Sequence, residues 1–256
     1  MIIKAKFVLL AIFLLTVPAI AESKAKVDPP GPHINKYVSA NGEARGTVIY
    51  IPQIHRSPGT EFRDPINNIA FITQKEIYGY LRTLKNEHKI NFYMGEAGMF
   101  GELPAAMIQS ATKSQDEREI FLRGALLKLE AEYGSGIVAY GSQNPETYEQ
   151  TVKIVDQKFV KKKLGNFSDL PVFSKAHAST ENKTKTEKMF REIVVEKRSL
   201  EAVDNFITGM KNTNSRTGVL IYGAGHGEQI ISGLRGKGFD VLVISPSLVH
   251  KKYPSL

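Results

Sequence analysis

Two apolar segments of strand length, one near each end of the chain, are each followed by a short breaker segment and a histidine. Residues 47–54 (TVIYIPQI) lead to His55, and residues 217–222 (TGVLIY) lead through Gly223-Ala224-Gly225 to His226. Both segments are rich in β-branched and aromatic residues, which favours strands buried on both faces, as in a parallel sheet. The carboxyl ends of parallel strands meet at one edge of the sheet, where ligand crevices form. If the two strands are neighbours, both imidazoles face one cleft.

The rest of the chain alternates between predicted strands and predicted helices. Hydrophobic periodicity and breaker residues predict strands at 47–54, 90–95, 136–140, 217–222 and 239–244. They predict helices at 66–87, 104–112, 115–133, 145–163, 184–211 and 226–236, with a loop at 165–180. Such alternation is typical of an α/β fold with a mostly parallel or mixed central sheet flanked by helices. We expect residues 47–256 to form a single domain.

Residues 1–21 have the pattern of a secretory signal peptide. Lys4 and Lys6 form a short basic region, residues 7–17 are apolar, and Ala19-Ile20-Ala21 is a small-x-small cleavage site. The apolar run is shorter than the roughly 20 residues of a membrane-spanning helix, although an uncleaved anchor is the alternative interpretation. We therefore expect an exported protein, periplasmic or secreted, with no transmembrane segment after cleavage. Residues 22–46 are predicted to form an extended N-terminal arm.

The amino-acid composition excludes several kinds of site and partner. The 256 residues include no cysteine, which excludes disulfides, a cysteine nucleophile and thiolate metal ligands. The net charge of +8 falls to +6 when Lys4 and Lys6 are removed with the signal peptide. The remaining excess includes two lysine clusters, which we interpret as solvated faces because aromatic residues are not interleaved with them. Nucleic acid is not an expected partner. The clusters are Lys161, Lys162 and Lys163, and Lys183, Lys185 and Lys188.

Two common enzyme signatures are missing. No Gly-x-Ser-x-Gly elbow of an α/β-hydrolase occurs. The segment from Gly223 to Gly227 resembles the opening of a dinucleotide-binding fold, but Glu228 stands where the third glycine belongs. Ser245 and Pro246 stand where that fold places an acid after the next strand. A nicotinamide or flavin cofactor is therefore not expected.

Three side chains that follow predicted strands form a candidate metal site. His55, Glu96 and His226 would supply two imidazoles and a carboxylate, which leaves one open position for water on a divalent ion. Such an ion lowers the pKa of bound water to about 7 and so provides a hydroxide nucleophile. The alternative is that the two histidines are loop residues held by backbone carbonyl groups.

These motifs resemble those of the superfamily that joins erythromycin esterase, the haem-binding ChaN proteins, TraB and the TIKI proteases. Its members share two Gly-x-x-His motifs in a duplicated α/β unit, with a glutamate and an arginine nearby. Gly223-Ala224-Gly225-His226 fits the second motif, Pro52-Gln53-Ile54-His55 fits the first with Pro52 in place of glycine, and Met94-Gly95-Glu96 fits the glutamate strand.

The resemblance also implies further site residues. Arg198 fits the arginine best, with Arg191 as the alternative, and Gly223 and Gly225 are predicted cofactor-binding positions. The sequence departs from the family pattern at two positions, since Gln53 and Gln143 stand where relatives often carry acids. These two substitutions make a binding protein, or an enzyme that has lost its activity, more plausible than for a typical member of the superfamily.

The motifs and the resemblance leave three alternative functions open. The first is an exported metal-dependent hydrolase of a small-molecule or peptide substrate, in which His55, Glu96 and His226 hold Mn, Co, Fe or Zn and Arg198 stabilises the oxyanion. In a metal-free variant, a histidine oriented by Glu96 is the general base. The second is a haem-binding iron-uptake protein, for which Tyr50 or Tyr222 could be the axial ligand, although their strand positions suit the core better. The third is a non-catalytic envelope protein.

Overall fold

The computed structural model describes residues 32–40, 42–57, 60–160 and 187–256. The predicted signal peptide, the loop at 165–180 and all the clustered lysines except Lys188 lie outside these ranges. Residues Gly31–Leu256 group into one compact unit. Among the described residues, no helix combines the length and the apolar character needed to cross a membrane.

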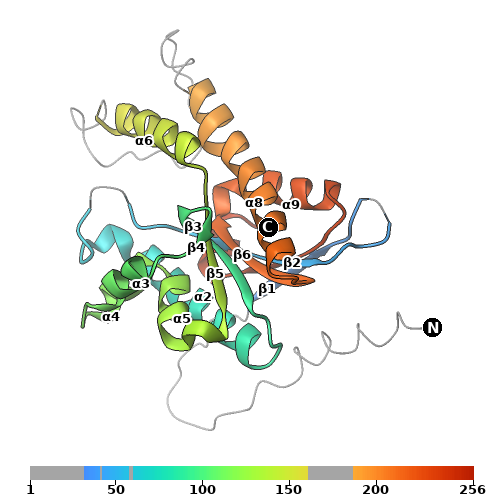
Figure 1. Cartoon of the computed structure of the whole chain (residues 1–256). Helices are drawn as coiled ribbons and strands as arrows, with labels where there is room; N and C mark the ends of the chain where they lie inside the picture. The colour runs from blue at the N-terminus through green and yellow to red at the C-terminus, as the bar shows by residue number, and fades with distance from the viewer. Residues whose placement is uncertain (1–31, 41, 58–59, 161–186) are drawn as a thin grey trace. The chain divides into compact units, whose positions relative to one another are not determined.

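A seven-stranded mixed sheet forms the centre of the described unit (Figure 1). Its spatial order is β1-β7-β2-β6-β3-β5-β4, in which β7, β2, β6, β3 and β5 run parallel and the two edge strands are antiparallel. The strands are β1 (His33–Tyr37), β2 (Thr47–Gln53), β3 (Phe92–Met99), β4 (Gly101–Glu102), β5 (Val138–Gln143), β6 (Thr217–Gly223) and β7 (Asp240–Ser245). The predicted α/β class and mostly parallel sheet are confirmed.

Helices connect the strands, with short 3-10 turns at several ends. The helices are α2 (Asn68–Asn86), α3 (Ala105–Thr112), α4 (Glu117–Arg123), α5 (Ala125–Tyr133), α6 (Pro145–Val160), α8 (Arg198–Asn212), α9 (Gly227–Gly236) and α10 (Ser247–Lys252). The 3-10 turns are η1 (Pro65–Asn67), η2 (Gly134–Gly136) and η4 (Ala224–His226), and η3 (Phe190–Lys197) is a π-helix that leads directly into α8.

Two predicted helices differ from those in the structure. The helix expected at 115–133 is split into α4 and α5, because Gly124 has a φ of 140°, a conformation outside the helical region. The helix expected at 184–211 is described from residue 187, and residues 190–197 within it form the π-helix η3. Hydrophobic periodicity does not distinguish these local changes from a continuous α-helix.

The predicted N-terminal arm contains a strand that the sequence analysis missed. Residues 33–37 form β1 and pair antiparallel with β7, with His33 opposite Ser245. The Asn35 side-chain amide also donates to the Leu256 carbonyl oxygen at 2.8 Å. A strand here covers the edge of β7, which would otherwise expose unpaired backbone groups.

Alternating side chains of the strands form two apolar layers, one on each face of the sheet. Val48 and Tyr50 of β2 pack with residues of α8 and α9, whereas Ile49 and Ile51 pack with residues of α2 and α5. This two-sided burial explains why the parallel strands read as continuous apolar runs in the sequence.

The connections of β2 and β6 leave these two neighbouring strands in opposite directions. From β2 the chain passes through α2 to β3, and from β6 it passes through α9 to β7, which lies on the other side of β2. Since α2 and α9 pack on opposite faces, the two connections diverge beyond the carboxyl ends of β2 and β6. Such a reversal of strand order is where ligands bind in open α/β sheets.

Replacing Phe206 tests the layer between the sheet and α8. This side chain is fully buried, and its ring centroid lies 5.3 Å from that of Phe92. We expect Phe206→Ala to lower the free energy of unfolding in urea by about 3–5 kcal/mol, because it removes a large buried side chain and leaves a cavity. Leu200→Ala is the control on the same helix. Leu200 is 55% exposed, so a change within about 0.5 kcal/mol is expected, and equal losses would contradict this packing.

Candidate functional site

The predicted site residues meet at the carboxyl ends of four neighbouring parallel strands. His55 lies two residues after β2, and His226 ends the 3-10 turn that follows β6. Glu96 follows Gly95, the last residue of β3 that pairs with β6, and Gln143 ends β5. The two histidine-bearing strands are neighbours, the condition under which the sequence places both imidazoles together, because β2 pairs with β6 and Gln53 lies opposite Gly223.

The Glu96 carboxylate accepts hydrogen bonds from three other groups of the site. Its Oε2 accepts a hydrogen bond from His55 Nε2 at 2.5 Å and another from the Gly223 backbone amide at 2.8 Å. Its Oε1 accepts from Arg198 Nη2 at 2.9 Å. Burial would raise the pKa of Glu96, but His55, Arg198 and His226 hold this pKa well below its usual range. Glu96 is therefore an ionised carboxylate.

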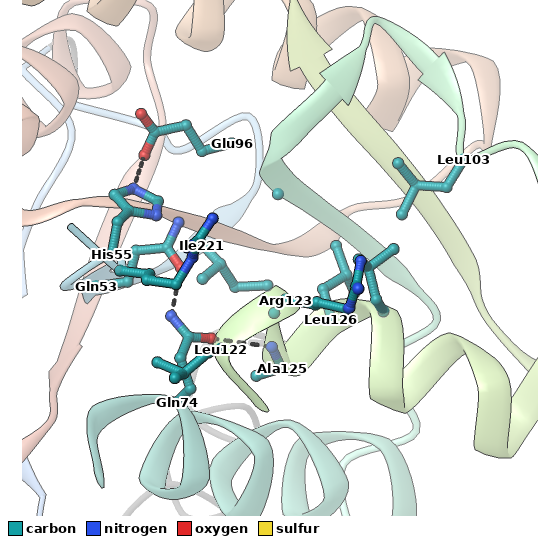
Figure 2. A pocket seen from close by; sticks show the side chains of 14 residues that line it. Gln53, His55, Gln74, Glu96, Leu103, Leu122, Arg123, Ala125, Leu126 and Ile221 are labelled. Atoms are coloured by element: carbon teal, nitrogen blue, oxygen red, sulfur yellow. Dashed lines mark hydrogen bonds and ion pairs between the residues drawn. The ribbon is translucent and has the colours of Figure 1, made fainter. Parts of the chain in front are cut away.

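His55 is fixed through one ring nitrogen. An ionised carboxylate can only accept hydrogen bonds, so His55 Nε2 carries a proton and donates it toward Glu96 (Figure 2). Burial would lower the pKa of His55, but the charge and hydrogen bond of Glu96 outweigh this effect and raise it above its ordinary value. Since the side chain is 49% exposed, Nδ1 is left as the nitrogen that can exchange a proton with a ligand or solvent.

His226 is fixed through its other ring nitrogen, Nδ1. Ser199 Oγ donates its single hydrogen to the Val195 carbonyl oxygen at 2.5 Å, so it can only accept from His226 Nδ1, which lies 2.9 Å away. The proton of the neutral ring therefore sits on Nδ1, and Nε2 keeps an unshared electron pair. Burial lowers the pKa of His226 and keeps the ring neutral. The sequence gives no sign of Ser199 beyond its place next to Arg198, and Val195 belongs to the π-helix.

Gly223 provides the space in which the three side chains converge. A Cβ atom at this position would lie 3.1 Å from Glu96 Oε2, 3.3 Å from His226 Cδ2 and 3.5 Å from His55 Nε2. The Glu96 oxygen cannot retreat without losing its bonds to His55 and to the Gly223 amide. Gly225 differs, because it is exposed and a Cβ there would meet no atom within 4 Å. The predicted role of these glycines in cofactor binding stays a prediction.

The structure distinguishes the two candidate arginines. Arg198 is 10% exposed and reaches Glu96, and its Nε lies 3.3 Å from Gln143 Oε1. Arg191 is 78% exposed and pairs with Glu196 at 3.1 Å. Gln143, which stands where relatives often carry an acid, thus accepts from the guanidinium group, and its own amide donates to the Glu96 carbonyl oxygen.

A small cavity of about 60 Å³ lies beside His55 and Glu96. Figure 2 shows it between the ends of the strands and the junction of α4 with α5. Gln74 closes its base, since its side-chain amide donates to Gln53 Oε1 at 2.9 Å and its oxygen accepts from the Ala125 backbone amide at 2.9 Å. Arg56 and Arg123 line the cavity, and no sequence motif points to either residue.

The predicted metal set is a poor fit to this arrangement. Glu96 already meets three donors, and the Arg198 guanidinium opposes a cation at the same carboxylate. Among the described residues no group of three histidine, aspartate or glutamate side chains is placed to hold a metal ion. The metal site therefore stays a prediction.

The two tyrosines considered as haem ligands are both buried in the core, as their strand positions suggested. Tyr50 and Tyr222 are 0% and 1% exposed. The Tyr50 hydroxyl donates to the Gly223 carbonyl oxygen at 3.2 Å, and burial raises the pKa of both phenols. Haem binding would need another donor at the cleft.

Gly223→Ala tests how closely the site is packed. We expect this change to lower the free energy of unfolding by about 1–3 kcal/mol, because the new methyl group displaces a hydrogen-bonded carboxylate. Gly225→Ala is the matched control, two residues away in open space, and should change stability little. Chemical denaturation of both variants measures the difference. Equal stability of the two would show that the three side chains do not converge at Gly223.

Comparisons with known proteins add no family to this description. No protein-family model, no curated protein and no solved structure matches the chain. The resemblance to the erythromycin esterase, ChaN, TraB and TIKI superfamily therefore stays a prediction from the quoted motifs.

Proposed function

We propose that this protein is an exported hydrolase that cleaves an ester or peptide bond with two histidines of complementary roles. One observation carries the proposal: the two imidazoles that converge at Gly223 are fixed in opposite ways. His226 is held with its proton on Nδ1 and an electron pair on Nε2, and His55 is held as a proton carrier by Glu96. Histidine pairs whose surroundings separate their proton affinities are suited to paired base and acid roles.

In the proposed reaction, His226 Nε2 takes a proton from water as the water oxygen bonds to the carbonyl carbon of the substrate. The carbonyl double bond opens and its electron pair becomes an oxyanion. His55 enters the cycle as an imidazolium with protons on both ring nitrogens, which the Glu96 carboxylate stabilises. When the oxyanion collapses, the bond to the leaving alcohol or amine breaks, and His55 donates its Nδ1 proton to that leaving group. Solvent then removes the proton from His226 and restores the one on His55.

Glu96 and Arg198 support this chemistry by charge. Glu96 stabilises the protonated form of His55 and fixes its ring, as the carboxylate does in hydrolytic triads. Arg198 lies in the same buried network, where Nη2 bonds to Glu96 and Nε to Gln143, and we propose that its other N–H groups donate to the oxyanion. A guanidinium group stays charged at any working pH, so it can act without a metal ion.

The leaving group of the substrate separates the two histidine roles. We expect His226→Ala to lower kcat about 10²–10⁴-fold on both 4-nitrophenyl and ethyl esters of short aliphatic acids. His55→Ala should lower kcat by a similar factor on the ethyl esters but much less on the nitrophenyl esters, because 4-nitrophenolate leaves without a proton. Steady-state kinetics of the purified mature protein on both series measures this.

Equal losses on both series in both variants would contradict the assignment of base and acid. The same preparation should be analysed for metal and for a Soret band. Stoichiometric metal whose removal abolishes activity would replace this mechanism with the metal-dependent one, and bound haem would favour the iron-uptake alternative. A wild-type protein inactive on ester and peptide panels would favour the non-catalytic alternative.

Arg198→Met tests the charge at the oxyanion. We expect a loss of about 10²–10³-fold in kcat, measured at a temperature at which circular dichroism shows the variant to be folded, because removing one oxyanion donor costs this much in hydrolases. Arg191→Met is the control, since Arg191 lies on the preceding π-helix and is exposed. Similar activity of the two variants would exclude Arg198 from the reaction.

A further inference from the structure

The cavity beside His55 has an excess of positive charge that the proposed chemistry does not use. Arg56 and Arg123 line it, and Glu96 is the only acidic side chain among the described residues that line it. That carboxylate is already neutralised by Arg198 and bonded to His55 and to the Gly223 amide. A substrate in this cavity therefore meets two guanidinium groups and no free carboxylate from the described lining residues.

Phe62 holds both guanidinium groups in place. The central carbon of Arg56 lies 4.6 Å from the centroid of the Phe62 ring, and that of Arg123 lies 5.1 Å from it. Guanidinium groups stacked on an aromatic ring keep their N–H donors in the plane of the group for other partners. Phe62 and Arg123 are 61 positions apart in the sequence, so only the fold brings this cluster together.

The two arginines differ in how far they are neutralised. Arg123 donates to Glu119 Oε1 through Nε at 3.2 Å and through Nη2 at 2.6 Å. Arg56 donates to the Thr60 carbonyl oxygen and, among the described residues, has no carboxylate partner. Arg56 is therefore the guanidinium group that is more available to an anion.

Apart from Gln53 and Gln74, the other side chains that line the cavity are apolar. Leu103, Leu122, Leu126 and Ile221 line it, and its volume of about 60 Å³ holds only a few water molecules. This combination suits a short aliphatic segment that ends in a small anionic group. The positive net charge of the chain also favours the approach of anions.

We propose that the substrate carries a carboxylate group, joined by a short aliphatic segment to the bond that is cleaved, and that Arg56, supported by Arg123, binds this carboxylate. The proposal rests on the proposed hydrolase function and names its substrate class. Arg56 and Arg123 act in it as specificity-determining residues, whereas the histidines perform the chemistry.

A matched pair of esters tests the substrate class. The mono-4-nitrophenyl ester of adipic acid and 4-nitrophenyl hexanoate have acyl chains of the same length and differ by one terminal carboxylate. We expect kcat/KM of the wild-type protein, after subtraction of spontaneous hydrolysis, to be at least about tenfold higher for the adipate ester, since a charge-assisted hydrogen bond is worth a factor of this size. Arg56→Met should bring the ratio toward one.

Arg63→Met is the control for a general effect of charge. Arg63 is 84% exposed, pairs with Asp116 and does not line the cavity, so the preference should persist in this variant. Binding of free adipate, measured by calorimetry against neutral hexanamide, provides a readout that does not depend on hydrolysis. We expect adipate to bind the wild-type protein and Arg56→Met to lose this binding.

The outcomes separate this inference from the function on which it rests. Adipate binding that depends on Arg56, without cleavage of either ester, would support the anion site and contradict the hydrolase. Cleavage of both esters at equal rates without adipate binding would overturn the anion site and leave the hydrolase standing. A preference for the adipate ester that persists in both Arg56→Met and Arg123→Met would also overturn the anion site.

Discussion

The buried charge of Glu96 is the constraint on which the rest of the site depends. A carboxylate with 11% of its side chain exposed is stable only when donors replace the water that it has lost. The protein supplies these donors from three separate elements: a histidine after β2, a backbone amide at the end of β6 and an arginine at the start of α8. Removal of any one partner would leave a charge poorly compensated, which is costly in a buried network.

The sheet topology explains why these groups can meet. Strand β6 follows β5 in the sequence but lies between β2 and β3 in the sheet. Glu96 therefore contacts His55, 41 positions away in the sequence, and Gly223, 127 positions away. The π-helix then positions Val195 so that its carbonyl oxygen accepts from Ser199, which in turn fixes His226. One irregular helical segment thus contributes to the protonation state of a site residue, and π-helical segments frequently occur at functional sites.

Much of the fold follows from the sequence, because parallel strands buried on both faces read as apolar runs and amphipathic helices show their period. All five predicted strands are present, and the repeated strand–histidine pattern before His55 and His226 pointed to the site. That the two strands pair with each other is shown by the structure. Strand β1 was missed because its residues, HINKY, are mixed in polarity. The break at Gly124 and the π-helix were missed because each changes the backbone without changing the hydrophobic pattern.

The site was predictable only in part, for a different reason. His55, Glu96, Arg198 and His226 stand out in short motifs, but Ser199, Arg56, Arg123 and Gln74 act through contacts made by tertiary packing. Gln53 and Gln143 show why a substitution read from the sequence is ambiguous. Both looked like lost acids, yet Gln53 anchors the base of the cavity and Gln143 bonds to Arg198 and to the Glu96 backbone.

The central claim is that the two imidazoles carry their protons on different ring nitrogens, Nδ1 in His226 and Nε2 in His55. Nitrogen NMR of the histidine rings tests this claim most directly. In ¹⁵N-labelled protein near neutral pH, long-range proton–nitrogen correlations report which ring nitrogen carries hydrogen. We predict a neutral His226 protonated at Nδ1 and a His55 protonated at Nε2, assigned through His226→Ala and His55→Ala. A His226 ring protonated at Nε2, or two rings with the averaged signals of solvent-exposed histidines, would contradict the account.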